Sequence, residues 1–228
     1  MDRTRATRFP FDPRQAIVTR TLPERQSDTC RVRRQTGILQ GLISQEHTQE
    51  WPEPVADHPI PGMHVWGWMT PDQLSWLSAQ AAQMQSVVEV GSLYGRSSFG
   101  LLTACQGPVY CIDPWPGHRY ESFMDECGHF PNLVAIREFS PAAAEQVPEV
   151  DMVFLDGDHE YEAVVADIET WLPKARKLLC GHDYGHPDHP GVAQAVDEIF
   201  GSRVVPAGPG HLAGIWTVQT GHASGSSR

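Results

Sequence analysis

Lysine is scarce in this sequence of 228 residues, which has only Lys174 and Lys177, and the G-x-x-x-x-G-K-[ST] loop that binds polyphosphates is absent. The chain has no apolar run of about 18 residues, so it predicts no membrane span. The first ten residues, MDRTRATRFP, lack the apolar stretch of a secretory signal. The five cysteines are odd in number and include no C-x-x-C pair, which favours a reduced protein in the cytoplasm.

Positive charge is also scarce beyond the first 40 residues. The formal net charge is -11, yet residues 1–40 hold nine arginines against four acids, a net of +5, which leaves -16 for residues 41–228. An acidic body argues against nucleic acid as the main partner, because phosphate binding needs a basic face. Residues 1–35 show no periodicity, and we expect a disordered basic arm that could contact RNA, a membrane surface or an acidic partner.

Helical and strand-like patterns alternate from residue 70 to about residue 220. TPDQLSWLSAQAAQM predicts a helix with Thr70 as its N-cap and Pro71 in its first turn. Other helices are predicted over residues 95–105, 119–127 and 141–146, from a cap at Asp158, and over 192–200. Strands are predicted over residues 86–90, 108–113, 133–137, 151–156, 177–181, 203–206 and 212–218. This order predicts an α/β fold, a doubly wound Rossmann-like sheet of seven mostly parallel strands with helices on both faces.

Shorter segments flank the predicted domain of residues 70–220. Residues 36–69 contain a short predicted helix over residues 36–49 and a connector rich in Pro and Trp. We expect this segment to form a lid or a dimer contact, and the protein in the second case would be a homo-oligomer. The tail of residues 221–228, GHASGSSR, is small and polar and is expected to be disordered.

Polar residues gather where the predicted parallel strands end. The first strand ends in Glu89-Val90-Gly91, the second in Asp113, the third runs into Ser140, the fourth ends in Asp156 and the fifth in His182-Asp183. In a doubly wound sheet, ligands bind beyond the carboxyl ends of the strands, near the point where the strand order reverses. We therefore expect these residues to share one site.

The stretch VVEVGSLYGRSS resembles a nucleotide-binding turn with the wrong glycine spacing. Gly91 and Gly95 stand four apart, and Leu93 occupies the place of the second glycine of a G-x-G loop. Gly91 would let the backbone approach a ligand, Gly95 would let the next helix begin close by, and Ser97 would add a hydroxyl. Free N–H groups at the helix start favour a phosphate or a carboxylate. A tight turn without a ligand is the alternative.

Asp113 and Trp115 extend the expected site to a nucleoside. Asp113 follows Glu89 by 24 residues, at the place where an acid accepts hydrogen bonds from ribose hydroxyls. Trp115 would cover an adenine face. A surface aspartate before a proline turn and a core tryptophan are the alternatives. Without a phosphate-binding loop, a nucleoside with a carboxylate tail fits better than a polyphosphate.

Asp156, His182 and Asp183 form a candidate metal site at the ends of two neighbouring strands. Two carboxylates and an imidazole without a thiolate point to Mg²⁺ or Mn²⁺, and the histidine also admits Fe²⁺, Ni²⁺ or Zn²⁺. Capping of the strand-end turns is the alternative for the acids, and a hydrogen bond to backbone is the alternative for His182.

His159 lies three residues after Asp156 and is the candidate general base. Its ordinary pKa near ~6.5 suits the removal of a hydroxyl proton. Helix capping or packing is the alternative. We expect His186, His189 and His211 to be loop histidines without a role in the site.

Together these motifs resemble the class I S-adenosylmethionine-dependent methyltransferases. The resemblance covers residues 86–218 and rests on EVGSLYGRS, Asp113, DMVFLDGDHEYE and GHDYG. It is strongest to the metal-dependent small-molecule O-methyltransferases of the catechol and the macrocin and mycinamicin types. One departure is His182, where those families usually carry a carboxylate or its amide, and this puts the need for Mg²⁺ in doubt.

The resemblance implies a role for each of these residues. Gly91, Ser92 and Ser97 would surround the methionyl part of the cofactor, Glu89 would orient its amino group, Asp113 would bind the ribose, Ser140 would border adenine, Asp156, His182 and Asp183 would hold the metal, and His159 would act as the base. The implied reaction is methyl transfer from S-adenosylmethionine to a hydroxyl of a small-molecule acceptor.

Three rival functions remain open from the sequence. A nucleotide-dependent oxidoreductase would need the pyrophosphate turn that Leu93 interrupts. A metal-dependent hydrolase or hydroxylase would use the metal residues without a methyl donor. A binding or assembly module would keep the methyltransferase-like fold without catalysis.

Overall fold

The computed structural model describes residues 55–208 and 214–221. The predicted basic arm, the helix over residues 36–49 and nearly all of the predicted tail lie outside the described residues. No helix in the described part of the chain is long and apolar enough to cross a membrane.

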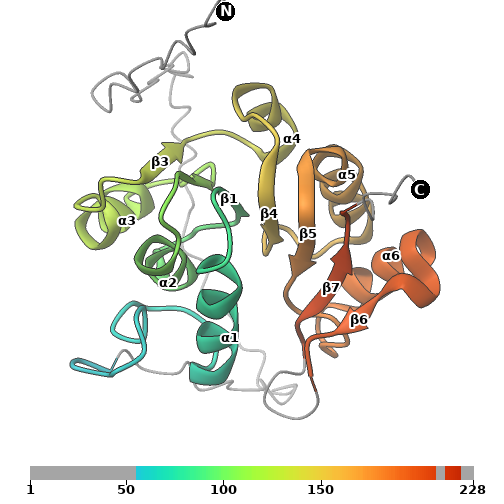
Figure 1. The fold of residues 1–228 in the computed structure, drawn as a ribbon, viewed down its shortest axis with the longest axis horizontal. Coiled ribbons are helices and arrows are strands. Elements are labelled where there is room, and N and C mark those ends of the chain that lie inside the picture. Colours follow the sequence, from blue (N-terminus) through green and yellow to red (C-terminus); the bar gives the residue numbers. More distant parts are fainter. Residues whose placement is uncertain (1–54, 209–213, 222–228) are drawn as a thin grey trace, which may run out of the picture.

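The described core is a seven-stranded sheet in the order β3-β2-β1-β4-β5-β7-β6 (Figure 1). The strands are β1 (Val87–Val90), β2 (Val109–Ile112), β3 (Leu133–Ile136), β4 (Val150–Leu155), β5 (Ala175–Gly181), β6 (Val205–Pro206) and β7 (Trp216–Gln219). The first five run parallel, and β7 is antiparallel to β5 and β6. The predicted sheet is confirmed, and its strand order reverses between β1 and β4.

Six helices of the described chain cover the two faces of the sheet (Figure 1). They are α1 (Pro71–Ala81), α2 (Arg96–Ala104), α3 (Arg119–Cys127), α4 (Ser140–Ala143), α5 (Tyr161–Trp171) and α6 (Pro190–Phe200). Short 3₁₀ turns follow at Ala144–Gln146, Leu172–Lys174 and Gly201–Arg203.

Alternate strand residues fill two separate cores, as expected for strands covered on both faces. Met152 and Phe154 of β4 pack with α1, α2 and α3, whereas Val153 and Leu155 pack with α4, α5 and α6. All four side chains are buried. The sheet is therefore held rigidly from both sides, and its carboxyl edge is a fixed platform.

The segment before α1 is tied to the start of α2 by a buried arginine. Arg96 donates from Nε to the Val65 carbonyl at 2.7 Å and from Nη1 to the Met69 carbonyl at 3.0 Å. Thr70 then caps α1 as predicted, because its side chain accepts from the Gln73 N–H and the Gln73 side chain accepts from the Thr70 N–H. These contacts hold residues 65–70 over one end of the sheet.

Two local predictions were wrong. Asp158 does not cap α5: the N-cap is Glu160, and the Asp158 carboxylate instead accepts from the Glu160 N–H at 2.9 Å in the turn before the helix. The strand predicted over residues 203–206 begins only at Val205, because residues 201–203 form a 3₁₀ turn.

Candidate active site

A cavity of about 1120 Å³ lies at the carboxyl ends of the parallel strands, beside the reversal of strand order. Its walls come from the turns after β1, β2, β3, β4 and β5, from residues 66–70 and from the cavity side of α5. Of the predicted site residues, Gly91, Ser92, Ser97, Asp113, Ser140, Asp156, His159, His182 and Asp183 line it.

Gly91 allows the turns after β1 and β4 to meet. Val90 pairs with Leu155 in the parallel ladder, so the next residues, Gly91 and Asp156, leave the sheet side by side. Gly91 has a φ of 89°, and a Cβ at this position would lie 1.9 Å from the Asp156 carbonyl oxygen. Only glycine fits such a contact, so the two halves of the cavity depend on this residue.

Glu89 lies beneath the turn and does not face the cavity. Its side chain is fully buried, and Oε2 accepts from the hydroxyls of Ser92 and Ser98. Within the described chain Oε1 has no hydrogen-bond partner. Burial raises the pKa of Glu89, although hydrogen bonds from Ser97, Ser98 and Ser92 oppose the shift. Glu89 thus orients the turn through its serines.

Ser98 is a residue that the sequence analysis did not select. It follows the acid by nine positions, and no short-range pattern connects a strand acid with a hydroxyl on the next helix. Only the close start of α2 brings them together, and it depends on Gly95.

Gly95 does not line the cavity, so its prediction as a cofactor-binding residue is corrected. It lies behind the turn and faces α3. Its φ is 101°, and a Cβ there would lie 2.7 Å from the Cys127 sulfur of α3. The residue therefore allows α2 to pack against α3.

Asp113 faces the cavity and also fixes the backbone at its edge, at Leu93 and Trp115. Oδ2 accepts from the Leu93 N–H at 3.0 Å, and Oδ1 accepts from the Trp115 N–H at 2.6 Å. Each carboxylate oxygen can accept a second hydrogen bond, so the pair of acceptors expected for ribose hydroxyls remains present.

The prediction for Trp115 was wrong. Its side chain is fully buried among the α1–α3 core residues, it packs at 4.6 Å between ring centroids from Phe123, and its Nε1 donates to the Leu93 carbonyl at 2.7 Å. Trp115 has a φ of 40°, which turns the ring away from the cavity and into the core. It braces the rim and does not cover a ligand.

The metal candidates Asp156, His182 and Asp183 converge in the structure. His182 Nδ1 lies 3.3 Å from Asp183 Oδ1 and 3.7 Å from Asp156 Oδ1. One ligand atom from each residue falls within 4.8 Å of the others. The carboxylates raise the pKa of the buried His182 even though burial itself acts to lower it.

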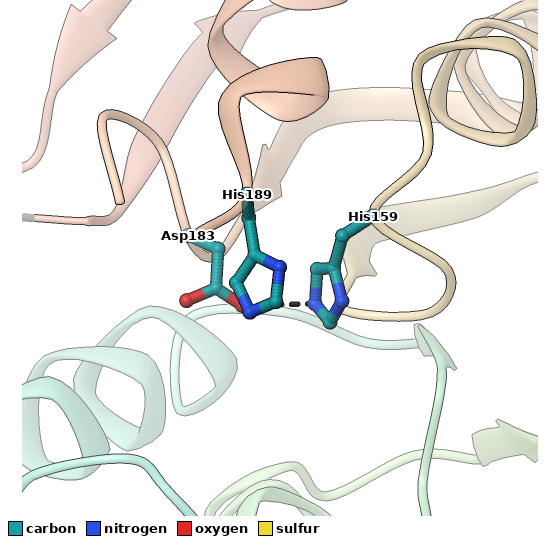
Figure 2. A group of neighbouring side chains, drawn as sticks. All are labelled: His159, Asp183 and His189. Atoms are coloured by element: carbon teal, nitrogen blue, oxygen red, sulfur yellow. Dashed lines mark ion pairs between the residues drawn. The ribbon is translucent and has the colours of Figure 1, made fainter. Parts of the chain in front are cut away.

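His159 lies against the same carboxylates (Figure 2). Its Nε2 is 2.9 Å from Asp183 Oδ2 and 3.9 Å from Asp156 Oδ1. The nearby carboxylates of Asp156 and Asp183 raise the pKa of His159 to about 10, although its burial acts to lower it. The two histidines in turn lower the pKa of Asp183, against the effect of its burial.

His189, expected to be a loop histidine, packs directly on His159. The two rings are stacked at 4.1 Å between centroids, and His186 stacks on His189 at 4.9 Å. Figure 2 shows His189 from the start of α6 beside His159 from the loop after β4. Burial lowers the pKa of His189, and His159 lowers it further. The stack fixes the plane of the His159 ring.

Carboxylates dominate the charge of the cavity. Of the described residues that line it, seven are Asp or Glu and two are Arg. Arg96, one of the two arginines, is bound to the carbonyls of Val65 and Met69. The cavity therefore favours cationic ligands over polyphosphates.

Part of the chain is similar to a known family model. Residues 88–184 match the family model described as a methyltransferase domain. The matched segment is less than half of the chain, and it includes the turns after β1, β2, β3, β4 and β5 that line the cavity.

Solved structures of O-methyltransferases share the fold. A putative O-methyltransferase from Klebsiella pneumoniae has a TM-score of 0.56 at 15% identity, over 68% of this chain and 82% of that one. The O-methyltransferase from Bacillus cereus in complex with SAH has 0.54 at 16% identity, over 66% and 82%. TomG from Streptomyces achromogenes, in complex with SAM, has 0.54 at 19% identity, over 67% and 82%. At these identities the likeness shows the fold alone.

A curated relative is the uncharacterized protein y4gI of Sinorhizobium fredii, which is 28% identical over half of this chain. The match spans only 14% of that protein.

Substitution of Gly91 tests the contact on which the cavity depends. Gly91→Ala should destabilise the protein by more than about 3 kcal/mol, because the positive φ and the clash with the Asp156 carbonyl add. Gly185→Ala is the matched control: its φ is 77°, but a Cβ there would have nothing within 4 Å, so the cost should be about 1 kcal/mol. Urea unfolding measures both, and equal losses would contradict the close-contact argument.

Proposed function

We propose that this protein is an S-adenosylmethionine-dependent O-methyltransferase that methylates a hydroxyl group of a small-molecule acceptor, with a divalent cation and His159 as its base. The supporting observation is that one cavity brings together the turn after β1, the Asp113 carboxylate and the cluster of Asp156, His182 and Asp183. We also propose that the protein works in the reducing cytoplasm, because the four described cysteines are free thiols.

The residues on the β1 and β2 side suit the methyl donor. The helix start at residue 96 offers free backbone N–H groups to a carboxylate, and Ser92 and Ser97 line the same turn. Asp113 offers acceptors to the ribose. The acidic walls favour the sulfonium charge of S-adenosylmethionine, whose methyl group is the one transferred.

The residues on the β4 and β5 side suit a divalent cation. Neighbouring ligands of an octahedral ion, at about 2.1 Å each, stand about 3 Å apart, and the His182–Asp183 and His182–Asp156 separations are close to this value. Asp156, His182 and Asp183 would hold the ion. When bound, it would polarise the acceptor hydroxyl and offset the carboxylate charge beside His159.

His159 is placed to take the hydroxyl proton at Nε2. Asp156 and Asp183 raise the pKa of the ring to about 10, so the ring would be protonated at neutral pH. It works as a base only when those carboxylates are neutralised. The stacked His189 holds the ring plane, so Nε2 stays directed at the cluster. The protonation of His159 would therefore depend on whether the cation site is filled, because Asp183 belongs to both.

Cofactor binding is the first test. Isothermal titration of the full chain with S-adenosylhomocysteine should show micromolar binding, and Asp113→Ala should weaken it at least about tenfold, because the ribose hydroxyls lose charged acceptors. Thermal melting without ligand separates this loss from damage to the rim that Asp113 braces. Wild-type protein that binds no S-adenosylhomocysteine would contradict the proposal.

Metal binding is tested by calorimetry with Mg²⁺ and Mn²⁺. Binding should release protons, because both histidines near the carboxylates have raised pKa values, and affinity should therefore increase with pH. Titration in two buffers of different ionisation enthalpy counts the protons. Asp156→Asn should weaken binding at least about tenfold, while Asp158→Asn, which removes a charge outside the cluster, should change it less than about threefold. Equal effects of the two variants would argue against a specific site.

The role of His159 is tested by separating turnover from binding. His159→Ala should lower turnover by about 100-fold or more, with S-adenosylhomocysteine affinity within about threefold of wild type. The readout is S-adenosylhomocysteine release over a panel of phenolic and sugar hydroxyl acceptors. His186→Ala, at the outer end of the histidine stack, is the control. A large loss of cofactor affinity in His159→Ala would refute its role as base.

A further inference from the structure

The two carboxylate oxygens of Asp183 face different groups of side chains. Oδ1 lies 3.3 Å from Nδ1 of His182, in the proposed cation site, whereas Oδ2 lies 2.9 Å from Nε2 of His159. His189 completes the second group: one ligand atom from each of His159, Asp183 and His189 falls within 4.8 Å of the others (Figure 2). A carboxylate placed in this way can offer one oxygen to each of two cations.

Two features of the fold bring His189 to this group. The His186 N–H donates to the Asp183 carbonyl at 3.0 Å, and the His189 N–H donates to the His186 carbonyl at 3.1 Å, so the segment between β5 and α6 turns back on itself. Gly191 then lets the start of α6 lie against the turn after β4, because a Cβ at this position would lie 2.7 Å from the His159 carbonyl oxygen. The two histidines therefore meet beside Asp183.

His159 Nε2 is the atom of this second group that lacks a partner. It is buried and forms no hydrogen bond in the part of the chain that the structure describes, although Asp183 Oδ2 is near. Ligands of a tetrahedral ion, at about 2.1 Å each, stand about 3.4 Å apart. The broad χ2 torsion of histidine allows the ring rotation that brings the three ligand atoms to this spacing.

The second group has the ligands of a transition-metal ion. It offers two imidazoles and one carboxylate, which reverses the ratio in the first group, Asp156, His182 and Asp183. Imidazole suits Zn²⁺, Fe²⁺ and Ni²⁺, whereas Mg²⁺ prefers oxygen. His159, Asp183 and His189 are all partly exposed, so an ion held by them keeps a position open to solvent.

We propose that His159, Asp183 and His189 form a second cation site, which binds a transition-metal ion such as Zn²⁺ and inhibits methyl transfer when it is filled. His159 Nε2 then gives its lone pair to the ion and can no longer accept the hydroxyl proton. The inhibition rests on the proposed function, whereas the binding of the ion does not. Mg²⁺ in the first site and Zn²⁺ in the second have opposite effects on turnover.

The test of binding measures Zn²⁺ affinity by competition with a chromophoric chelator, with excess Mg²⁺ present. His189→Ala and His189→Gln should each weaken Zn²⁺ binding at least about tenfold, because one of three ligands is lost. The His189 side chain makes no capping hydrogen bond to α6, so both variants should fold, and melting curves check this.

Two variants are controls for this measurement. Asp156→Asn alters only the first group, and His186→Ala alters the outer end of the histidine stack, so each should leave Zn²⁺ affinity within about threefold of wild type. Zn²⁺ binding that Asp156→Asn weakens and both His189 variants leave unchanged overturns the inference.

Inhibition is measured separately. Zn²⁺ at concentrations that fill the second site should lower the turnover of wild-type protein at least about tenfold and leave S-adenosylhomocysteine affinity within about threefold. Excess chelator should restore turnover. Full turnover with the second site filled overturns the inhibitory role. Wild-type protein that binds no S-adenosylhomocysteine overturns the proposed function, while the Zn²⁺ titrations still decide the second cation site.

Discussion

The close approach of two backbones at the reversal of strand order is the constraint on which the site depends. Gly91 and Asp156 leave the sheet as neighbours, and the contact between them leaves no space for a side chain. Because the turns meet there, the turn after β1 and the carboxylate–histidine cluster after β4 and β5 share one cavity. In the proposed reaction, a wider gap would separate the methyl group from the acceptor oxygen, which must approach it within about 3–3.5 Å.

Bringing the strand ends together also concentrates negative charge. The cavity lining carries five more carboxylates than guanidinium groups, and Glu89 is buried just beneath it. The structure offsets this in two ways. Serine hydroxyls donate to Glu89 Oε2 and backbone N–H groups donate to Asp113, while His159 and His182 face Asp156 and Asp183. A sulfonium and a divalent cation would complete the balance, so cofactor, metal and protonation of the histidines are electrostatically linked.

The sequence was enough to predict the sheet and the residues at strand ends, because hydrophobic runs and the rule for parallel sheets are both local signals. The sequence analysis was wrong where packing between distant segments determines the direction in which a residue faces. The backbone at Trp115 turns its ring into the core, and Gly95 faces α3. Asp167 lines the cavity from α5, which no spacing in the sequence reveals.

His182 in place of the family's usual carboxylate or amide changes the chemistry of the proposed metal site. A neutral imidazole removes one negative charge from the ligand set, which weakens the attraction for Mg²⁺, an ion that prefers oxygen. Imidazole is a good ligand for Fe²⁺, Ni²⁺ and Zn²⁺. The raised pKa of His182 means that protons compete with any ion for Nδ1. Under the proposed mechanism, the ion that displaces protons most effectively would also leave His159 the better base, because His159 faces the same carboxylates.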